Sequence, residues 1–301
     1  MFEKALLLFN GNENQEKIQK NLELTSGVLA SYIEKLVIIQ TQYKGHTEKI
    51  CENIDGEYDA VFLIGGDGTL HECINGLAKL NDPPAAGILP GGTCNDFSRA
   101  LHIPQMLKRA VETLINGTVR YLDIGKMNER YFANFYGIGL IAETSENINE
   151  NWKGLFGKVS YFISALQTFT NTSPFSYSLQ TKEEAIDGEA VMVLISNGNF
   201  IGTNQLPFQN NEMDDGQFDI FIISEGGAAL LREYLNAKNP FVWEADQSDI
   251  QHYRSSNIYL QTSKQMKADT DGEIYMETPV SIKNLHKKIP FVVPNDMLPK
   301  R

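Results

Sequence analysis

The segment Ile64-Gly65-Gly66-Asp67-Gly68-Thr69 joins two patterns of different period. Before it stands the apolar run from Ala60 to Ile64, which indicates a short buried strand. After it, apolar residues recur at the spacing of one helix face, at Leu70, Ile74 and Leu77. Glycines between a strand and a helix let the backbone turn tightly and bring its N–H groups close to a ligand. The segment therefore predicts an anion-binding loop at a helix N-terminus, with a plain tight turn as the alternative.

A second unit of strand, glycines and helix follows the first. The run from Ala86 to Leu89 is again apolar, Gly91-Gly92-Thr93 interrupts it, and Phe97, Ala100 and Leu101 begin another helical stripe. In a doubly wound sheet, the loops at the carboxyl ends of adjacent strands border one crevice. Both glycine loops are therefore expected to hold the same ligand, which makes a plain turn the weaker explanation of the first.

The carboxylate of Asp67 indicates that a cation also binds at this loop. A carboxylate inside a phosphate-binding loop repels the phosphate unless a cation or a firmly placed hydrogen-bond donor screens it. We therefore expect Mg²⁺ near Asp67. The pattern G-x-x-x-x-G-K-[ST] is absent from the sequence, so phosphate would be held without the lysine of that motif.

The pattern of the chain changes at about residue 125. Before that point, short apolar runs alternate with helical periodicity, as in a doubly wound α/β layer. There we predict a helix over residues 18–33 and strands over residues 5–9, 36–40, 60–64 and 86–89. After it, β-branched and aromatic runs predict a mostly antiparallel domain, with strands over residues 131–135, 190–196, 218–224 and 258–261. The spacing of large apolar residues predicts one amphipathic helix over residues 152–169.

Length, composition and charge exclude several classes of protein. The 301 residues suffice for two domains, and 42% hydrophobic with 21% charged residues is ordinary for a folded chain. With 38 acidic and 26 basic residues the net charge is −12, which repels nucleic acids at long range. No apolar run approaches the roughly 18 residues of a membrane span, and the apolar run after Lys4 is too short for a signal peptide. Three scattered cysteines are typical of reduced thiols, so we expect a cytoplasmic protein that binds no nucleic acid.

Two acidic clusters late in the chain leave two interpretations open. They are Met213-Asp214-Asp215-Gly216 and Asp269-Thr270-Asp271-Gly272-Glu273. Asp-Gly pairs are common in β-turns, so both clusters fit turns between strands. Alternatively, a rigid turn aims the carboxylate of Glu273 as a general base. Both clusters look like pieces of an EF-hand loop, but with Gly272 at the sixth position of such a loop the first and twelfth positions would be Lys267 and Thr278, which supply no carboxylate, so calcium binding of that type is excluded.

Other candidate motifs are weaker. Gly137-Ile138-Gly139-Leu140-Ile141-Ala142 matches the dinucleotide fingerprint, but residues 151–182, where an acidic residue should recognise the ribose, contain no Asp or Glu. The five histidines lack a metal-ligand spacing, and Cys94 is better explained as a small packed residue than as a nucleophile. No G-x-S-x-G motif is present in the sequence, so zinc and serine-hydrolase chemistry are set aside.

The acid-free segment of residues 151–182 is locally basic. Its three lysines, Lys153, Lys158 and Lys182, give it a charge of +3, and seven of its residues are aromatic. It fits a core helix whose lysines reach solvent. It also fits a helix that presents an apolar, weakly basic face to a bilayer or a lipid tail.

Taken together, the motifs resemble those of one family. The two glycine loops, extended to residues 65–76 and 89–97, are followed in order by Leu122-Asp123-Ile124-Gly125, Ser196-Asn197-Gly198, Asp214-Asp215-Gly216 and Asp271-Gly272-Glu273. This series resembles the catalytic domain of the diacylglycerol kinases, in particular the soluble bacterial lipid kinases, over nearly the whole chain. The first loop alone is less specific, because NAD kinases and phosphofructokinases share it.

The resemblance implies a fold and a reaction. It implies a nucleotide-binding α/β domain over residues 1–124, with residues 288–301 packed back on it, and a lipid-binding β-sandwich over residues 125–287. ATP would be held between the two domains, and its phosphoryl group would pass to the hydroxyl of diacylglycerol or a related lipid alcohol. The protein would then work in the cytoplasm in peripheral contact with a membrane, and whether it forms a homodimer is left open.

The resemblance also assigns roles to residues. Those that would line the nucleotide site are Asn10, Thr41, Gly66, Asp67, Gly68, Thr69, Leu70, His71, Glu72, Gly92, Thr93 and Asn95. Asp215 would hold Mg²⁺, flanked by the backbone carbonyls of Glu212 and Gln217. Asp67, Asp96 and Asp123 would join that ion through carboxylates and water. Glu273 would be the base that takes the proton of the lipid hydroxyl.

The sequence departs from the family at three places. Asn10 is followed by Gly11-Asn12-Glu13-Asn14 rather than by proline and a small glycine-containing loop, and His71 replaces the commoner asparagine. Asn199-Phe200-Ile201-Gly202-Thr203 stands where relatives often have several glycines. Two other functions therefore stay open: a kinase for a soluble metabolite such as NAD, and a catalytically silent sensor of nucleotide or anionic lipid.

Overall fold

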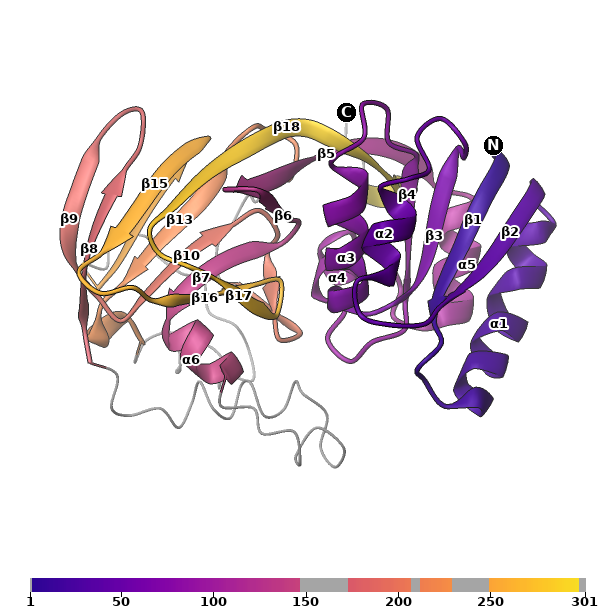
Figure 1. Ribbon diagram of the computed structural model, residues 1–301, viewed down its shortest axis with the longest axis horizontal. Helices are drawn as coiled ribbons and strands as arrows, with labels where there is room; N and C mark the ends of the chain where they lie inside the picture. The colour runs from indigo at the N-terminus through magenta and orange to yellow at the C-terminus, as the bar shows by residue number, and fades with distance from the viewer. Residues whose placement is uncertain (1, 147–172, 207–211, 229–248, 298–301) are drawn as a thin grey trace. The chain divides into compact units, whose positions relative to one another are not determined.

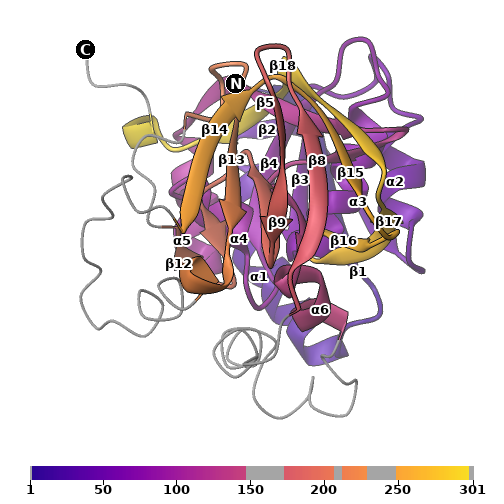
Figure 2. The same cartoon turned by 90° about the vertical axis from the view of Figure 1, so that its left-hand side faces the viewer.

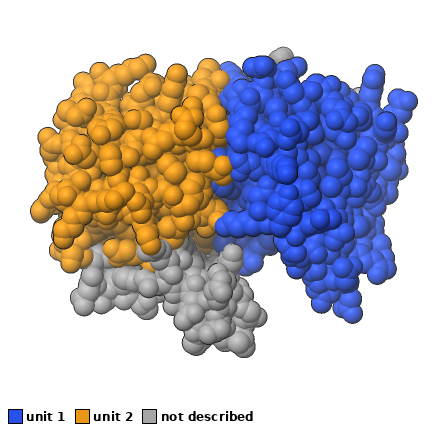
Figure 3. Space-filling model, in the orientation of Figure 1, with its two compact units in different colours: residues 1–124, 287–301 blue, residues 125–286 orange. Residues whose placement is uncertain are grey.

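The computed structural model of the protein describes residues 2–146, 173–206, 212–228 and 249–297. The chain divides into two compact units, each with its own core (Figure 3). Unit 1 comprises residues 1–124 and 287–301, and unit 2 comprises residues 125–286. The chain thus leaves unit 1 once and returns to it near the C-terminus.

Unit 1 is built on a parallel sheet with the strand order β2-β1-β3-β4 (Figure 1). Its central strands are buried on both faces, which explains their continuous apolar sequence. Helix α1 packs with α5, and α2 packs with α3. The strands are β1 (Phe2–Asn10), β2 (Ile33–Thr41), β3 (Ala60–Gly65) and β4 (Ala85–Pro90), and the helices are α1 (Gln15–Ala30), α2 (His46–Cys51), α3 (Asp67–Leu77), α4 (Asp96–Ala100) and α5 (Leu107–Ile115).

The C-terminal residues complete unit 1. Strand β18 (Val280–Val293) places Phe291 opposite Ala86 of β4 in parallel register. The Phe291 ring also lies 5.3 Å from the ring of Phe97, and both side chains are buried. Arg120 on β5 (Thr118–Met127) donates to the carbonyl of Met297 at 2.7 Å.

Unit 2 is a β-sandwich. One six-stranded sheet has the order β14-β13-β10-β7-β16-β17, and the strands β18-β15-β8-β9 form the other layer (Figure 2). A core cluster with residues from both layers, among them Tyr136, Val193, Phe218, Leu260 and Ile282, holds the layers together. The further elements of this unit are β6 (Arg130–Phe132), β7 (Phe135–Gly139), α6 (Leu140–Glu146), β8 (Phe175–Gln180), β9 (Ala185–Ala190), β10 (Met192–Ser196), β11 (Phe200–Ile201), β12 (Asn204–Gln205), β13 (Phe218–Ile223), β14 (Ile250–Ser255), β15 (Asn257–Thr262), β16 (Lys267–Thr270) and β17 (Glu273–Glu277).

Several predicted boundaries are wrong. The helix expected over residues 18–33 ends at Ala30, because Ile33 already pairs with Phe2 as the first residue of β2. The strand expected over residues 131–135 is split between β6 and β7, because the intervening backbone N–H groups bind a carboxylate instead of a neighbouring strand. The strand expected over residues 190–196 is likewise the end of β9 followed by β10.

Three further expectations concern the helix over residues 152–169, the segment that begins at Gly137, and membrane-spanning helices. The helix expected over residues 152–169 lies outside the described residues. The fingerprint-like segment from Gly137 does join a strand to a helix, but β7 is antiparallel to both of its neighbours, unlike the strand of a dinucleotide-binding unit. Among the residues that the structure describes, no helix has the length and apolarity needed to cross a membrane.

Candidate functional site

The two glycine loops of unit 1 touch through their backbones. Gly66 follows β3 and caps α3, and a Cβ atom added there would lie 2.9 Å from Cα of Gly92. A Cβ atom added at Gly92 would lie 2.4 Å from Cα of Gly66, closer than such atoms approach. The N–H of Gly91 also donates to the carbonyl of Gly65 at 2.9 Å. The structure thus brings both predicted loops to one edge of the sheet, with a spacing that only glycines allow.

Asn95 holds the second loop in shape. Its Oδ1 accepts the N–H of Gly92 at 2.9 Å, and its Nδ2 donates to the carbonyl of Gly92 at 3.1 Å. Asn95 has a φ of 52°, a left-handed conformation that asparagine tolerates better than most residues. The amide side chain of Asn95 is therefore engaged by the backbone of Gly92, while Gly92 and Thr93 are exposed to solvent.

The first turns of α3 and α4 place Asp67 and Asp96 together. One ligand atom each from Asp67, Asp96 and Cys94 lies within 4.8 Å of the others. Oδ1 of Asp67 also accepts the N–H of Phe97 at 3.4 Å. The two carboxylates suit a hard cation such as Mg²⁺, which prefers oxygen ligands, whereas a thiol suits softer metals. Asp67 and Asp96, two of the three carboxylates expected in a magnesium network, thus lie close together in unit 1, and the network itself stays a prediction.

Asn10 ends β1 and Thr41 ends its neighbour, the edge strand β2. They are register partners, and Asn10 uses its Oδ1 to accept the N–H of Asn12 at 2.9 Å. Thr41 is buried and donates its hydroxyl to the carbonyl of Phe9 at 3.2 Å. Both residues stand at the carboxyl edge of the sheet, the edge that also carries the glycine loops.

Lys17 was missed by the sequence reasoning. Its Nζ donates to the carbonyl of Gly91 at 3.0 Å and pairs with Glu13 at 2.8 Å. A lysine on an exposed turn of α1 has no motif around it, so only the folded chain shows that it reaches the second glycine loop. It supplies a positive charge beside the loop, the feature that a Walker lysine provides in other phosphate sites.

Three other residues of α3 that were predicted to line the nucleotide site are buried or hydrogen-bonded within unit 1. Leu70 and His71 are buried. The carboxylate of Glu72 accepts the N–H groups of Gly45 at 2.7 Å and Thr47 at 3.2 Å, and so caps the N-terminus of α2. For Glu72 the fold thus provides a structural explanation that the sequence did not suggest.

Asp123 lies deep in unit 1. Its side chain is fully buried, and its Oδ1 accepts the N–H of Lys287 at 2.7 Å. It therefore joins β5 to the returning strand β18. Its expected place in a magnesium network stays a prediction.

In unit 2, Asp271 and Gly272 form the turn between β16 and β17. Both have positive φ, 53° and 88°, as a two-residue hairpin turn of type I′ requires. The turn is held by the buried carboxylate of Asp271, which accepts N–H groups of Ala133 at 2.8 Å, Asn134 at 2.9 Å and Phe135 at 3.0 Å. The cluster is therefore a β-turn, as one interpretation expected, and it is a rigid one.

Glu273 is the first residue of β17 and pairs with Thr270. Its side chain is half-buried. Nearby, the guanidinium of Arg130 lies 5.3 Å from the ring centre of Tyr275. Burial, together with the negative charges of Asp271 and Glu273, raises the pKa of Tyr275 to about 12, against the opposing effect of Arg130. At neutral pH this phenol keeps its proton beside the Glu273 carboxylate.

Asp271→Ala is expected to destabilise unit 2. The substitution removes the acceptor of three backbone N–H groups and leaves them buried, at a cost of roughly 3 kcal/mol in the free energy of unfolding. Urea denaturation followed by circular dichroism measures the loss. Asp187→Ala on the exposed part of β9 is the matched control and should cost little. Equal stability of the two variants would contradict the anchoring role of Asp271.

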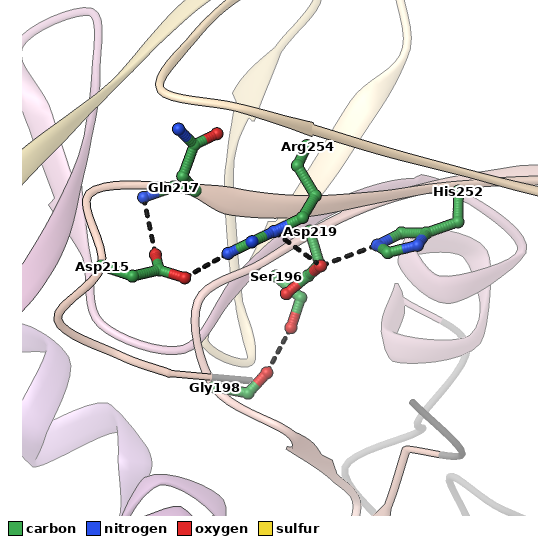
Figure 4. Close-up of polar contacts among 7 residues, drawn as sticks. All are labelled: Ser196, Gly198, Asp215, Gln217, Asp219, His252 and Arg254. Atoms are coloured by element: carbon green, nitrogen blue, oxygen red, sulfur yellow. Dashed lines mark hydrogen bonds and ion pairs between the residues drawn. The ribbon is translucent and has the colours of Figure 1, made fainter. Parts of the chain in front are cut away.

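The Asp215 loop precedes β13 (Figure 4). Oδ1 of Asp215 accepts the N–H of Gln217 at 2.9 Å, and its Oδ2 pairs with Arg254 of β14. Gly216 has a φ of 80°, which tightens the loop, while the predicted flanking residue Glu212 is exposed. In the same view, Ser196 donates to the carbonyl of Gly198. The three predicted metal residues thus share one loop.

Two family models divide the chain between them. Residues 4–127 match the diacylglycerol kinase catalytic domain, and residues 136–296 match the YegS C-terminal NAD kinase beta sandwich-like domain. A protein of Staphylococcus aureus (strain JH9) named "Putative lipid kinase SaurJH9_0749" is 33% identical over 298 residues, which cover 97% of this chain and 98% of that protein. The chain belongs to the diacylglycerol kinase family. The predicted family is thereby confirmed.

Further members of the diacylglycerol kinase family agree in sequence and in fold. A "Putative lipid kinase" of Staphylococcus carnosus (strain TM300) is 31% identical over 293 residues, 96% of each chain. The crystal structure of a "putative diacylglycerol kinase from Bacillus anthracis str. Sterne" superposes with a TM-score of 0.90 at 34% identity, over 99% of each chain. The predicted fold class, an α/β domain followed by a β-sandwich, is therefore confirmed. Membership in this kinase family supports a phosphotransferase.

Proposed function

We propose that this protein transfers the γ-phosphoryl group of ATP, with Mg²⁺, to the hydroxyl of diacylglycerol or a related lipid alcohol. The observation that carries the proposal is the contact between the two glycine loops, where each Cα occupies the space of the other's missing side chain. Helix α3 begins at Asp67, directly after the first loop, and the first N–H groups of an α-helix have no partner within the helix. Such N–H groups and a helix N-terminus bind phosphate. Family membership supports the same reaction class.

Unit 1 would bind the nucleotide. Gly66 and Gly68 would offer backbone N–H groups to the phosphates, Gly92 would make room for the first loop, and Lys17 would add a positive charge at the second loop. Phosphoryl transfer requires little covalent chemistry from the protein and depends on positioning and charge neutralisation. Glu273 of unit 2 would remove the proton of the lipid hydroxyl. The turn before it, held by Asp271, would keep its carboxylate in a fixed direction.

The donor sets fit Mg²⁺. Asp67 and Asp96 lie close together on unit 1, and Asp215 stands on a tight loop of unit 2 between Glu212 and Gln217. Mg²⁺ is usually held by one or two carboxylates, with waters and phosphate oxygens as further ligands. Bound there, the ion would neutralise charge that develops on the transferred phosphoryl group.

Asp67→Ala is expected to weaken nucleotide-dependent activity and its response to magnesium. The change removes one of two adjacent carboxylates at the start of α3 and α4. Titration of Mg²⁺ at fixed ATP should require a higher concentration for half-maximal rate. Asp55→Ala, at an exposed position of the same unit, serves as the control. A variant with the wild-type magnesium curve would remove Asp67 from the site.

The acceptor is tested with labelled ATP, Mg²⁺ and mixed micelles of lipids. Diacylglycerol, monoacylglycerol, ceramide and phosphatidylglycerol cover the main classes of lipid hydroxyl, and extraction into organic solvent identifies a phosphorylated lipid. No labelled lipid across this panel would count against the proposal. Phosphorylation of NAD in the absence of lipid would favour the metabolite kinase instead. We also propose that the protein phosphorylates its lipid at the cytoplasmic surface of a membrane.

A further inference from the structure

Arg254 connects the Asp215 loop to the sheet of unit 2. It lies on β14 directly opposite Asp219 of β13, and its Nε is 3.4 Å from Oδ1 of Asp219 (Figure 4). The other end of its guanidinium pairs with Oδ2 of Asp215. Asp219 Oδ1 in turn lies 2.7 Å from Nε2 of His252. One guanidinium is thus shared by two carboxylates of different kinds, one on a loop and one on a strand.

The two carboxylates differ in their surroundings. Asp219 is buried, and the regular register of β13 and β14 holds it in place. Asp215 is half-buried on a loop, where its carboxylate contacts the N–H of Gln217 and the guanidinium. The side chain of Arg254 is 44% exposed, so the guanidinium has room to move away from Asp215 without opening a cavity.

A divalent cation that binds Asp215 meets a carboxylate that is already paired with the positive charge of Arg254. A guanidinium within about 4–6 Å stabilises the ionised carboxylate strongly, and it repels a second cation at the same distance. The guanidinium and the cation therefore compete for one ligand. The cation competes with Arg254 for Asp215 alone, because Asp219 lies outside the loop and is not one of the predicted cation ligands.

We propose that Arg254 is a tethered counterion of Asp215, which a divalent cation displaces when it binds the loop, and that Asp219 retains the displaced guanidinium. The inference rests on the assignment of Asp215 as a cation ligand in the proposed function. It makes the strand pair β13–β14 a determinant of cation affinity, although neither Arg254 nor Asp219 binds the cation.

Arg254→Gln is therefore expected to tighten cation binding. Removal of the competing charge should lower the Kd for Mn²⁺ or Mg²⁺ roughly tenfold, as expected for a charge at this distance. Isothermal titration calorimetry on the full chain, without nucleotide or lipid, measures this change independently of activity. Arg254→Lys keeps the charge and should stay near the wild type. Lys264→Gln, at an exposed position of the same unit, removes an equal charge and should also leave the Kd unchanged.

Asp219→Asn is expected to act in the opposite direction. Without its second carboxylate partner the guanidinium remains on Asp215, so the Kd should rise. In the Arg254→Gln background the same substitution should have a much smaller effect, because there is no guanidinium to retain. A purely structural role for these two residues would weaken binding in both single variants. Thermal unfolding of each variant verifies that the sandwich is intact.

Asp215→Asn separates the two levels of inference. If it abolishes binding while Arg254→Gln binds no more tightly than the wild type, Arg254 is no counterion and the inference fails alone. If Asp215→Asn binds the cation as the wild type does, the ligand assignment in the proposed function fails, and the inference fails with it. Loss of binding in Asp215→Asn with tighter binding in Arg254→Gln supports both.

Discussion

Glu273→Gln is expected to bind ATP normally and to lose most of kcat. The substitution keeps the size of the side chain and the hydrogen-bonded turn before it, since Asp271 still accepts its three backbone N–H groups. It removes the group that would take the proton of the acceptor hydroxyl. General base catalysis typically contributes about 10²–10⁴-fold, and kcat should fall by that factor. Steady-state assays with lipid and an equilibrium measurement of ATP binding report the two quantities separately.

Glu277→Gln is the matched control for this loss. Glu277 ends the same strand, β17, and is exposed, so its substitution should leave both kcat and ATP affinity unchanged. Turnover of Glu273→Gln at the wild-type rate would show that another group accepts the proton. A joint loss of ATP binding and kcat would instead indicate a structural defect.

Gly92→Ala is expected to weaken ATP binding markedly. The added Cβ would lie 2.4 Å from Cα of Gly66, and both partners are backbone, so one loop must shift. Such overpacking costs about 1–3 kcal/mol, and a shift of the loops also turns their N–H groups away from the phosphates. We expect the Kd for ATP to rise by about tenfold or more, which fluorescence competition with a labelled nucleotide measures.

Gly27→Ala provides the comparison within the same unit. Gly27 lies in helix α1, and a Cβ added there meets no atom within 4 Å. Alanine is the better helix former by about 1 kcal/mol, so this variant should be equally or more stable and should bind ATP normally. Normal ATP affinity in Gly92→Ala would mean that the contact between the glycine loops does not shape the nucleotide site.

The sequence predicted those features that depend on local pattern. The strands before both glycine loops were found because they are buried on both faces and therefore apolar throughout. Their convergence followed from the rule for adjacent parallel strands, and the structure places Gly66 against Gly92. The Asp271–Gly272 turn was one of the two interpretations that its residue types allowed, while the hydrogen bonds from residues 133–135 to Asp271 depend on a partner far away in the sequence.

Features that depend on partners far away in the sequence could not be predicted from it. Lys17 and Arg254 sit among polar residues on exposed faces, where a charge ordinarily contacts water. Glu72 matched a motif, but its carboxylate caps α2, whose N-terminus no pattern revealed. Strand β18 has a polar middle and contains Pro290, which breaks the apolar alternation of a strand. The roles of the predicted site residues in binding and catalysis stay predictions.

The return of the chain to unit 1 affects how the protein can be made. Strand β4 finds its outer neighbour only in β18, which is synthesised after all of unit 2, and the buried side chain of Phe291 fills the space beside Phe97. A nascent chain therefore exposes that edge until β18 has been synthesised, and a polypeptide that stops at residue 124 retains an open flank lined by apolar side chains. Such a fragment should aggregate, so the nucleotide-binding half is best studied in the intact polypeptide or with its terminal strand grafted back by a linker.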